Sequence, residues 1–410
     1  MEPKIYFDNN ATTPIRREVY EKMIPYLTEH FGNPSSVHWA GRTVDNAIEE
    51  ARGYVAKLIN ASDKDIVFTA GGSESDNHAI KGVFFANKQK GRHIITTKVE
   101  HPAVLETVKD LKKFGADITF LDVDEYGELN LSELEKSIRP DTILVTVMYA
   151  NNETGVIFPI KEIVRIVKRK NPDTIVHTDA VQAAGKEKID VIDLGVDLLS
   201  ISGHKLYAPK GVGALYIKRG LRIERLISGG HQERNRRAGT ENVASIVAFG
   251  EAARLAANEI DEEKRRLSYL RDKLENAILE KIPYVKLNGH KEHRLCNTTN
   301  LSFKYIEGEG ILLSLDMVGI AASSGSACTS GSLDPSHVLL AMGLDHETAH
   351  GSVRISLGRF NTEEEVDYMI KELPPIIERL RKMSPLYNRR PDEPEPFKVE
   401  ACHNHDHGEE

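Results

Sequence analysis

Short apolar segments rich in β-branched residues alternate with amphipathic segments between residues 60 and 220. Several apolar segments, such as ILVTVMY and DLLSIS, are continuously hydrophobic, which is typical of strands covered by helices on both faces. Strands that alternate with helices through short links predict a mostly parallel sheet in an α/β domain. The expected strands are 65–69, 92–98, 117–122, 142–149, 175–178, 198–201 and 212–217.

The pattern changes after residue 240, where a long amphipathic helix is expected to run to Lys281. Strands (VKLNG, TTNLSFKYI, VRISLGRF) and helices (GEGILLSLDMVG, EEEVDYMIKELPPIIERLRKM) then follow without strict alternation, which predicts a smaller α+β domain. We expect residues 15–259 to form the large domain, and 1–14 with 260–387 to form the small one. Residues 388–410 hold little apolar material and are expected to be a disordered acidic tail.

Composition narrows the class of protein. The 410 residues include 54 basic and 62 acidic side chains, a formal net charge of −8, which argues against a protein that coats nucleic acid or anionic lipid. Three cysteines in a chain of this size do not form a disulfide framework, so a reducing compartment is expected. No secretory signal or membrane-spanning stretch is visible in the sequence, and the expected location is the cytoplasm.

Small and polar residues follow the predicted strands, at the edge where open parallel sheets bind ligands. In AGGSESDN, Gly72 and Ser73 begin a predicted helix, whose free N–H groups and dipole can hold an anion. An ordinary glycine turn with a serine cap is the alternative interpretation. His101 and Asn152 follow two further strands, and a helix cap and a turn former are the alternatives for them.

Two strand ends carry charged residues that are costly to bury. Asp179 ends an apolar strand and needs a cationic partner there. Lys205 follows the strand ending near Ile201, where partial loss of water lowers a lysine pKa and gives a usable amine nucleophile. A surface lysine is the alternative. An anion-binding helix start, an aspartate and a lysine together fit one cofactor, pyridoxal 5′-phosphate.

The second domain adds a thiol in an unusual setting. Cys328 lies in SSGSACTSGS, a run that cannot form a core and is expected to be a mobile loop. An exposed thiol on such a loop can act as a nucleophile, whereas a buried, inert thiol is the alternative. Arg354, in the strand pattern GSVRISLGRF, can grip a carboxylate through two nitrogens.

Taken in order, the motifs resemble those of the cysteine desulfurases of the NifS and IscS type, which are fold-type I pyridoxal-phosphate enzymes of the class V aminotransferase family. The resemblance extends from Asp8 to about Leu386. It implies a large domain with a mostly parallel seven-stranded sheet and a smaller α+β C-terminal domain. The matching motifs are FDNNATT, FGNPSSVH, GGSESDN, EHPAV, NNETGV, HTDAVQ, SGHKLYAPKGVG, GGHQERNRRAGTEN, SSGSACTSGSLDPSHV and VRISLGRF.

The resemblance implies a role for each matching residue. Lys205 would form the Schiff base with the cofactor, and Asp179 would pair with the pyridinium nitrogen. His101 would stack on the ring and handle protons. Arg354 would hold the substrate carboxylate, and Cys328 would accept the sulfur.

Further positions match residues around the rest of the cofactor. Gln182 and Asn152 would lie near its phenolic oxygen, with Asn152 also near the substrate. Thr240 would contact the phosphate across a homodimer interface, so that the active site is shared. Many relatives have threonine where this chain has Ser73, and the hydroxyl is retained. The residues implied to form the phosphate cup are Gly72, Ser73, Ser202 and His204.

The implied reaction removes sulfur from L-cysteine, gives L-alanine and leaves a persulfide on Cys328. The implied sulfur acceptor is a U-type scaffold protein for iron–sulfur cluster assembly. No resident metal is expected, beyond a brief contact of Cys328 with a cluster on that partner. Selenocysteine lyase and aminotransferase activity on the same fold are alternatives, as is a non-catalytic scaffold.

Two further features have no part in this scheme. Cys296 is assigned no role. The tail offers metal-ligand chemistry within a short span, for which a solvated acidic tail with incidental histidines is the alternative. The tail residues concerned are Cys402, His403, His405 and His407.

Overall fold

A computed structural model describes residues 4–324 and 334–388. All seven strands predicted between residues 60 and 220 form one sheet, in the order β2-β8-β7-β6-β5-β3-β4. β8 runs antiparallel to β2 and β7, and the other neighbours are parallel, as expected of a mostly parallel sheet. The strands are β2 (Ile66–Thr69), β3 (His93–Thr97), β4 (Asp117–Leu121), β5 (Thr142–Thr146), β6 (Ile175–Asp179), β7 (Leu198–Ser202) and β8 (Gly213–Ile217).

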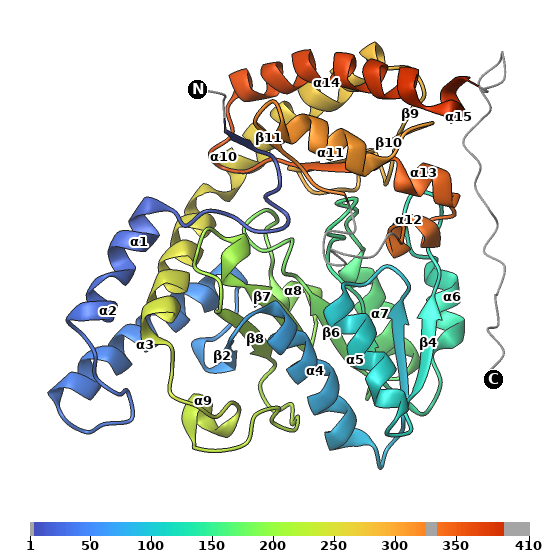
Figure 1. Ribbon diagram of the computed structural model, residues 1–410. Coiled ribbons are helices and arrows are strands. Elements are labelled where there is room, and N and C mark those ends of the chain that lie inside the picture. Colours follow the sequence, from blue (N-terminus) through green and yellow to red (C-terminus); the bar gives the residue numbers. More distant parts are fainter. Residues whose placement is uncertain (1–3, 325–333, 389–410) are drawn as a thin grey trace.

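Helices cover both faces of this sheet, which explains why its strands are continuously apolar (Figure 1). On one face, Ile94 and Leu144 pack with side chains of α4 (Gly72–Asn87) and α5 (Pro102–Lys112). On the other, their neighbours Ile95 and Val145 join a larger cluster. That cluster includes residues of α3 (Trp39–Leu58), α7 (Ile160–Lys170) and α10 (Val243–Lys281).

A second group of elements packs beside the large sheet. Its antiparallel sheet has the order β12-β10-β9, and β1 (Ile5–Tyr6) pairs with β11 (Ile320–Ala321). Their apolar faces form a third cluster, with Phe7, Leu274 and Phe303 fully buried in it. The remaining elements of this group are β9 (Val285–Leu287), β10 (Thr298–Phe303), α11 (Gly308–Asp316), β12 (Ser352–Ser356) and α14 (Glu363–Met383).

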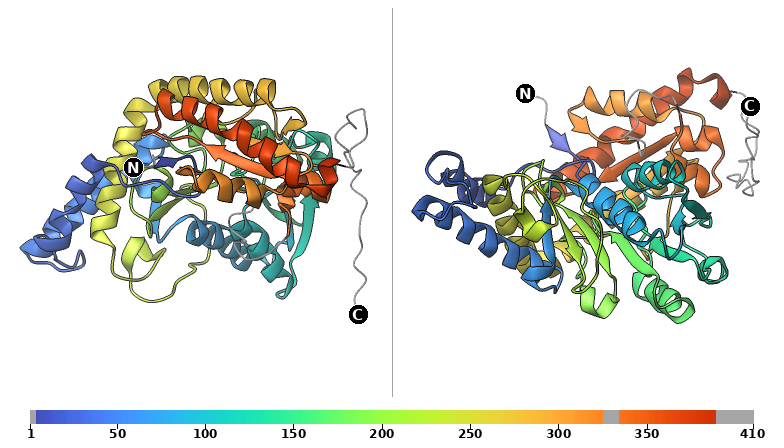
Figure 2. Two further views of the ribbon diagram at one scale, coloured as in Figure 1. Left: turned by 45° about the horizontal axis from the view of Figure 1, so that its top comes forward. Right: turned by 90° about the horizontal axis from the view of Figure 1, so that it is seen from below.

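The long helix α10 connects the two groups, packing on α3 at one end and on α14 at the other (Figure 2). The predicted boundary at residue 260 falls inside this helix, and the proposed domain limits stay a prediction. Two short helices from the C-terminal half, α12 (His337–Ala341) and α13 (His346–His350), contribute Leu339 and Ala349 to the core of the large sheet.

Short helices complete the fold. The chain before α3 forms α1 (Arg17–Met23) and α2 (Pro25–Thr28), and Pro25 occupies the first position of the second helix, where a proline is tolerated. Other short segments are α6 (Leu131–Ser137), α8 (Val191–Leu194), α9 (Gln232–Asn235) and α15 (Pro385–Asn388). No helix in the described part of the chain is both long and apolar enough to cross a membrane.

Candidate active site

The carboxyl ends of β6 and β7 are neighbours in the sheet and bring Asp179 and Lys205 to the same edge. β7 ends at Ser202, and one turn of 3-10 helix then carries Lys205. The Lys205 Nζ donates hydrogen bonds to the backbone oxygens of Asn10 and Ala11, the latter at 2.7 Å. The chain segment that precedes the first helix therefore lies directly against the lysine.

Asp179 is buried at the end of β6, with 6% of its surface exposed. Its Oδ1 accepts a hydrogen bond from Val181 N at 2.9 Å. Burial raises the pKa of Asp179 to about 6, and both this hydrogen bond and the charge of Lys205 act in the opposite direction. The carboxylate at this place is therefore stabilised by any further positive charge, such as a protonated ring nitrogen.

His101 caps the first turn of α5, as one interpretation of the sequence proposed. Its Nδ1 accepts a hydrogen bond from Ala103 N at 3.1 Å, which assigns the proton of the neutral ring to Nε2. Burial, together with a smaller effect of the charge of Lys205, lowers the pKa of His101 to about 4. The imidazole is therefore neutral at pH 7 and lies close enough to Lys205 to respond to its charge.

Asn10 connects several candidate residues, and sequence reasoning assigned it no role. Its backbone oxygen accepts hydrogen bonds from Lys205 Nζ and, at 2.9 Å, from Gln182 Nε2. Its side-chain Nδ2 donates to the backbone oxygen of Asn152 at 3.1 Å. The motif FDNNATT, which precedes the first helix without joining any predicted element, was the signal that could have identified it.

The residues expected to form the phosphate cup lie where the first turn of α4 meets the end of β7. A Cβ atom on Gly72 would lie 2.8 Å from Val181 Cγ2 and 3.6 Å from Ser202 Cβ, so only glycine allows this close approach. The N-cap, Gly71, offers no side-chain cap, and Ser73 is exposed beside the free helix end. His204, two residues beyond Ser202, is also close to the N-terminal segment, with its Nδ1 3.2 Å from Thr12 Oγ1.

Two buried polar atoms at this edge have no hydrogen-bond partner among the described residues, namely Gln182 Oε1 and Ser202 Oγ. Buried polar atoms are normally satisfied, so a missing partner indicates a place for a polar ligand. Pyridoxal 5′-phosphate fits this donor set. Asp179 would meet its ring nitrogen, Gln182 its phenolic oxygen, and Ser202 with the start of α4 its phosphate.

Arg354 lies on β12 and is 2% exposed, with its guanidinium near the same N-terminal segment. Its NH2 is 2.8 Å from Asp8 Oδ1, and its NH1 donates to the backbone oxygen of Asn152 at 3.1 Å. Within the described chain, its Nε is buried without a partner. A substrate carboxylate would therefore meet an arginine whose position is already fixed by Asp8.

One predicted site residue lies away from this cluster, and another falls outside the described residues. Thr240 is exposed, between α9 and α10, and within one chain it belongs to the surface. Cys328 lies outside the described residues, as do Cys402 and the tail histidines. Cys296, to which no role was assigned, is 2% exposed in the core of the second group, where burial raises the pKa of its thiol to about 11.

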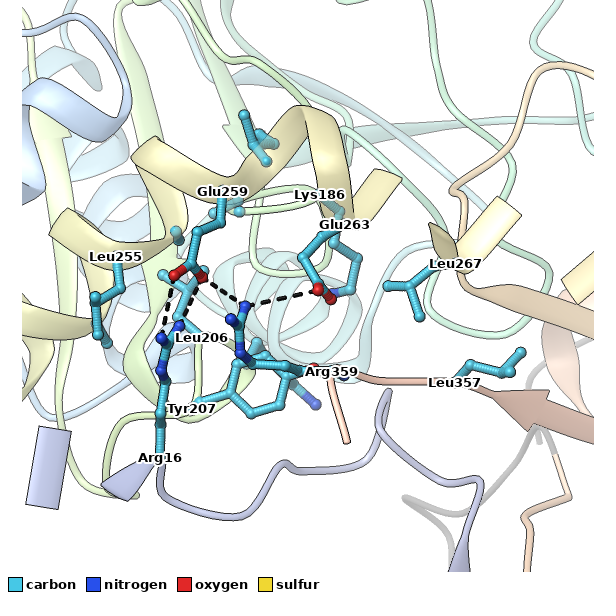
Figure 3. A pocket seen from close by; sticks show the side chains of 16 residues that line it. Arg16, Lys186, Leu206, Tyr207, Leu255, Glu259, Glu263, Leu267, Leu357 and Arg359 are labelled. Atoms are coloured by element: carbon cyan, nitrogen blue, oxygen red, sulfur yellow. Dashed lines mark hydrogen bonds and ion pairs between the residues drawn. The ribbon is translucent and has the colours of Figure 1, made fainter. Parts of the chain in front are cut away.

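Another side of Lys205 faces a pocket between α10 and the chain around Tyr207 (Figure 3). We call it the second pocket, to distinguish it from the site at the sheet edge. It encloses about 550 Å³, counting the part that opens to solvent. Glu259 accepts hydrogen bonds from Arg16 at 2.6 Å and from Arg359 at 2.5 Å. Lys186 also lines it, and its Nζ donates to the backbone oxygen of Gln182 at 2.9 Å. Burial lowers the pKa of Lys186 to about 8.

One group of possible metal ligands is present in the described chain, formed by Glu128, His290 and His293. His290 Nδ1 already accepts hydrogen bonds from the backbone N of Glu292, at 3.0 Å, and of His293, at 2.8 Å. A neutral imidazole has one lone pair on nitrogen, so this arrangement leaves Nε2 protonated and unable to bind a cation. The group is therefore better explained by the contact between His293 Nδ1 and Glu128 Oε1, at 2.8 Å.

Comparison with known proteins agrees with this geometry. The family model described as "Aminotransferase class-V" matches residues 5–369. "Cysteine desulfurase 2" of Trichormus variabilis is 54% identical over 388 residues, which are 95% of this chain and 96% of that protein. A solved "NIFS-LIKE PROTEIN" superposes with a TM-score of 0.87 at 42% identity, covering 92% of this chain and all of that one. "SspA in complex with cysteine" has a TM-score of 0.77 at 36% identity, covering 88% of this chain and all of the other.

Proposed function

The chain belongs to the class-V aminotransferase family and is a cysteine desulfurase, and we propose that Lys205, Asp179 and Cys328 carry its reaction. The observation that supports this assignment most strongly is the edge of the sheet where buried Asp179, Lys205 and the unpartnered Gln182 Oε1 and Ser202 Oγ meet. The seven-stranded sheet agrees with fold type I of the pyridoxal-phosphate enzymes.

The cofactor in this proposal is pyridoxal 5′-phosphate, which when bound draws electron density from the substrate and makes its Cα acidic. Lys205 would hold it through the side-chain amine and would serve as the base at the substrate. The neighbouring Asp179 carboxylate would keep the ring nitrogen protonated. Arg354, held by Asp8 at 2.8 Å, would orient the substrate through its carboxylate.

His101 has a more restricted role in this geometry than its residue type suggests. Its Nδ1 is occupied as the cap of α5, so the Nε2–H is what it presents as a hydrogen-bond donor. To accept a proton, the ring must give up its hydrogen bond with Ala103 N. We therefore assign general base chemistry at the substrate to Lys205, and assign to His101 stacking on the ring and donation from Nε2.

The sulfur step belongs to Cys328. Its thiolate would attack the substrate sulfur, so that an S–S bond forms while the C–S bond of the substrate breaks. The electron pair of that C–S bond goes to the carbon framework, which takes up a proton and leaves as L-alanine. Cys328 then holds the sulfur as a persulfide.

The test of this assignment compares Cys328→Ala with Cys402→Ala as a matched cysteine control. After exposure to L-cysteine, mass measurement of alkylated protein should find persulfide in the parent and in Cys402→Ala but none in Cys328→Ala. Cofactor absorbance should be retained in all three proteins. Persulfide formation at the parental rate in Cys328→Ala would show that another group accepts the sulfur.

We further propose that the enzyme is a homodimer in which Thr240 reaches the phosphate bound by the partner. The exposed position of Thr240 supports this, since the residue touches no ligand site within its own chain. Large apolar side chains are also exposed between residues 27 and 39, among them Phe31 at 79% and Trp39 at 69%. Sedimentation of the holoenzyme tests the dimer, and a monomer at working concentration would contradict it.

The proposed acceptor of the persulfide is a U-type iron–sulfur scaffold protein in the cytoplasm. The resemblance to the NifS and IscS type supports the partner, and the scarcity of cysteines supports a reducing compartment. Incubation of the persulfidated enzyme with purified scaffold tests the transfer. Sulfur that stays on the enzyme would argue for a different acceptor.

A further inference from the structure

The segment from His231 to Thr240, which we call the hook, holds an unfavourable backbone conformation. Three successive residues other than glycine, Glu233, Arg234 and Asn235, have φ values of 47°, 56° and 64°. L-residues in the left-handed region are disfavoured by contact between Cβ and the backbone, and they occur as single residues rather than in runs. The hook, which includes α9 (Figure 1), must therefore be held in place by other contacts.

One contact is a buried ion pair between the hook and α3. Glu233 is 8% exposed, and its two carboxylate oxygens accept hydrogen bonds from Arg52 NH1 at 2.7 Å and NH2 at 2.9 Å. Glu233 Oε2 also accepts from the backbone N of Phe68, on β2, at 2.9 Å. A two-pronged pair with a third donor is among the strongest arrangements for a carboxylate, and it fixes the strained turn to the sheet.

Arg52 is itself held from several sides, so it provides a rigid support. It is 3% exposed, its NH1 also donates to Ile66 O at 3.1 Å, and its guanidinium lies 4.7 Å from the centre of the Phe68 ring. Its Nε reaches Glu49 on its own helix at 2.9 Å. Glu49 also pairs with Arg234 of the hook, at 3.2 Å, so the control for Glu233 is the next residue of α3, exposed Glu50, which accepts a hydrogen bond from Tyr54 on its own helix.

A second contact ties the far end of the hook to the phosphate-binding helix of the same chain. Arg237 Nε is 2.9 Å from Glu74 Oε1, and Arg237 NH2 is 3.2 Å from Glu74 Oε2. Glu74 follows Ser73 in the first turn of α4. Only Ala238 and Gly239 separate this anchor from exposed Thr240, so the position of the threonine depends on how the hook is held.

We propose that Glu233 and Arg52 are positioning residues that hold the hook in its strained form and thereby place Thr240 for the partner's cofactor phosphate. This rests on the proposed role of Thr240 in a shared active site. Neither residue touches the cofactor, so both act through the backbone between Glu233 and Thr240. Releasing the pair would let the three left-handed residues relax and would withdraw the threonine.

The test measures equilibrium binding of pyridoxal 5′-phosphate to the cofactor-depleted full-length dimer of four variants. Thr240→Val should weaken binding about tenfold, the effect of losing one hydrogen bond to a charged group. Glu233→Gln should weaken it to a similar degree, and the double variant should bind no worse than either single one. Glu50→Gln, which changes an exposed carboxylate on the same helix as Arg52, should bind as the parent does.

The outcomes separate the two levels of the proposal. Unchanged binding in Thr240→Val would overturn the proposed function of that residue. Weaker binding in Thr240→Val with unchanged binding in Glu233→Gln would overturn the positioning role alone, as would losses that add in the double variant. If Glu233→Gln does not fold, Arg52→Lys replaces it in the test. This variant keeps the charge but loses the two-pronged contact, and it should weaken cofactor binding to the same degree.

A readout independent of the cofactor completes the test. Hydrogen exchange at the backbone amides of residues 231–240 should become faster in Glu233→Gln and Arg52→Lys, and should be unchanged in Glu50→Gln. Equal exchange in the parent and in Glu233→Gln would show that the ion pair does not hold the hook.

Discussion

Two polar regions meet at Lys205, and they differ in how their polar groups are paired. At the sheet edge, Gln182 Oε1 and Ser202 Oγ are buried without partners in the described chain, and Asp179 has a raised pKa. In the second pocket, the Glu259 carboxylate is shared by two arginines (Figure 3). Unpaired buried groups indicate a ligand site, whereas mutually paired ones indicate a structural role. Both regions contain charged side chains, so the presence of charge alone does not distinguish the ligand site from the structural pocket.

The second pocket is better understood as part of the connection between the two groups of elements. Arg359, just beyond β12, pairs with Glu259 of α10, and its backbone N donates to Tyr207 OH at 2.7 Å. Arg16, which precedes α1, donates to the same glutamate. Segments from three parts of the chain therefore join at one carboxylate. Lys186 is the exception in this pocket, since no carboxylate among the described residues pairs with it.

The largest effect should come from exchanging the lysine that both regions share. Lys205→Ala should lower turnover of L-cysteine by at least about 10³-fold, because it removes both the covalent attachment and the base. Borohydride reduction followed by mass measurement should find no cofactor linked to the variant. Lys186→Met, which changes a lysine of the second pocket, should retain the linkage. If the cofactor linkage required Lys186 instead, the second pocket and not the sheet edge would be the cofactor site.

Asp179→Asn should have the next largest effect. The neutral amide cannot stabilise a positive ring nitrogen, and losing a buried charge partner costs about 3–5 kcal/mol, or roughly 10²- to 10⁴-fold in kcat/KM. The spectrum of the bound cofactor should shift as the ring nitrogen loses its proton. Asp193→Asn, at an exposed pair with Lys161, serves as the control. Parental kcat/KM in Asp179→Asn would contradict the assignment.

A third prediction concerns pH and the buried Glu100, beside His101. Its Oε1 accepts from Thr97 Oγ1 at 2.8 Å and Met148 N at 3.0 Å, while burial raises its pKa from 4.5 to about 8. Between these pH values the folded chain keeps a proton that the unfolded chain loses. The free energy of unfolding should therefore fall with rising pH, by up to about 1.4 kcal/mol per pH unit from this group.

Glu100→Gln should remove that part of the pH dependence. Urea unfolding of the parent and the variant measures this pH dependence. The experiment covers roughly pH 5 to pH 8, where Glu100 is protonated in the folded chain and ionised in the unfolded chain. The exposed Glu106→Gln is the control and should follow the parent. Parallel curves for the parent and Glu100→Gln would show that Glu100 is ionised in the fold.

Sequence patterns predicted the sheet better than they predicted the contacts around the site. The seven strands were recognisable because burial on both faces makes them continuously apolar, and their polar ends predicted Asp179 and Lys205 at one edge. Asn10 was missed because it acts through its backbone oxygen, which no residue type reveals. Lys186 was missed because its lowered pKa depends on packing against α10, far along the chain.

The smallest effect tests the second pocket. Burial of Lys186 lowers its pKa from 10.5 to about 8, so below pH 8 the folded chain must hold a charge that the pocket disfavours. Lys186→Met keeps the stem and removes the charge. It should raise the free energy of unfolding by about 1–3 kcal/mol at pH 7, and the gain should disappear as pH rises toward about 10.5.

Urea unfolding at pH 7 and at alkaline pH measures this gain, with exposed Lys188→Met as the control. Because the effect lies in the pocket whose other charges are paired, cofactor binding by Lys186→Met should match the parent. A variant that is less stable at pH 7 would show that the Lys186 charge has a partner in the native protein. The second pocket would then also hold a buried group whose partner is a ligand, and the two regions would no longer differ in kind.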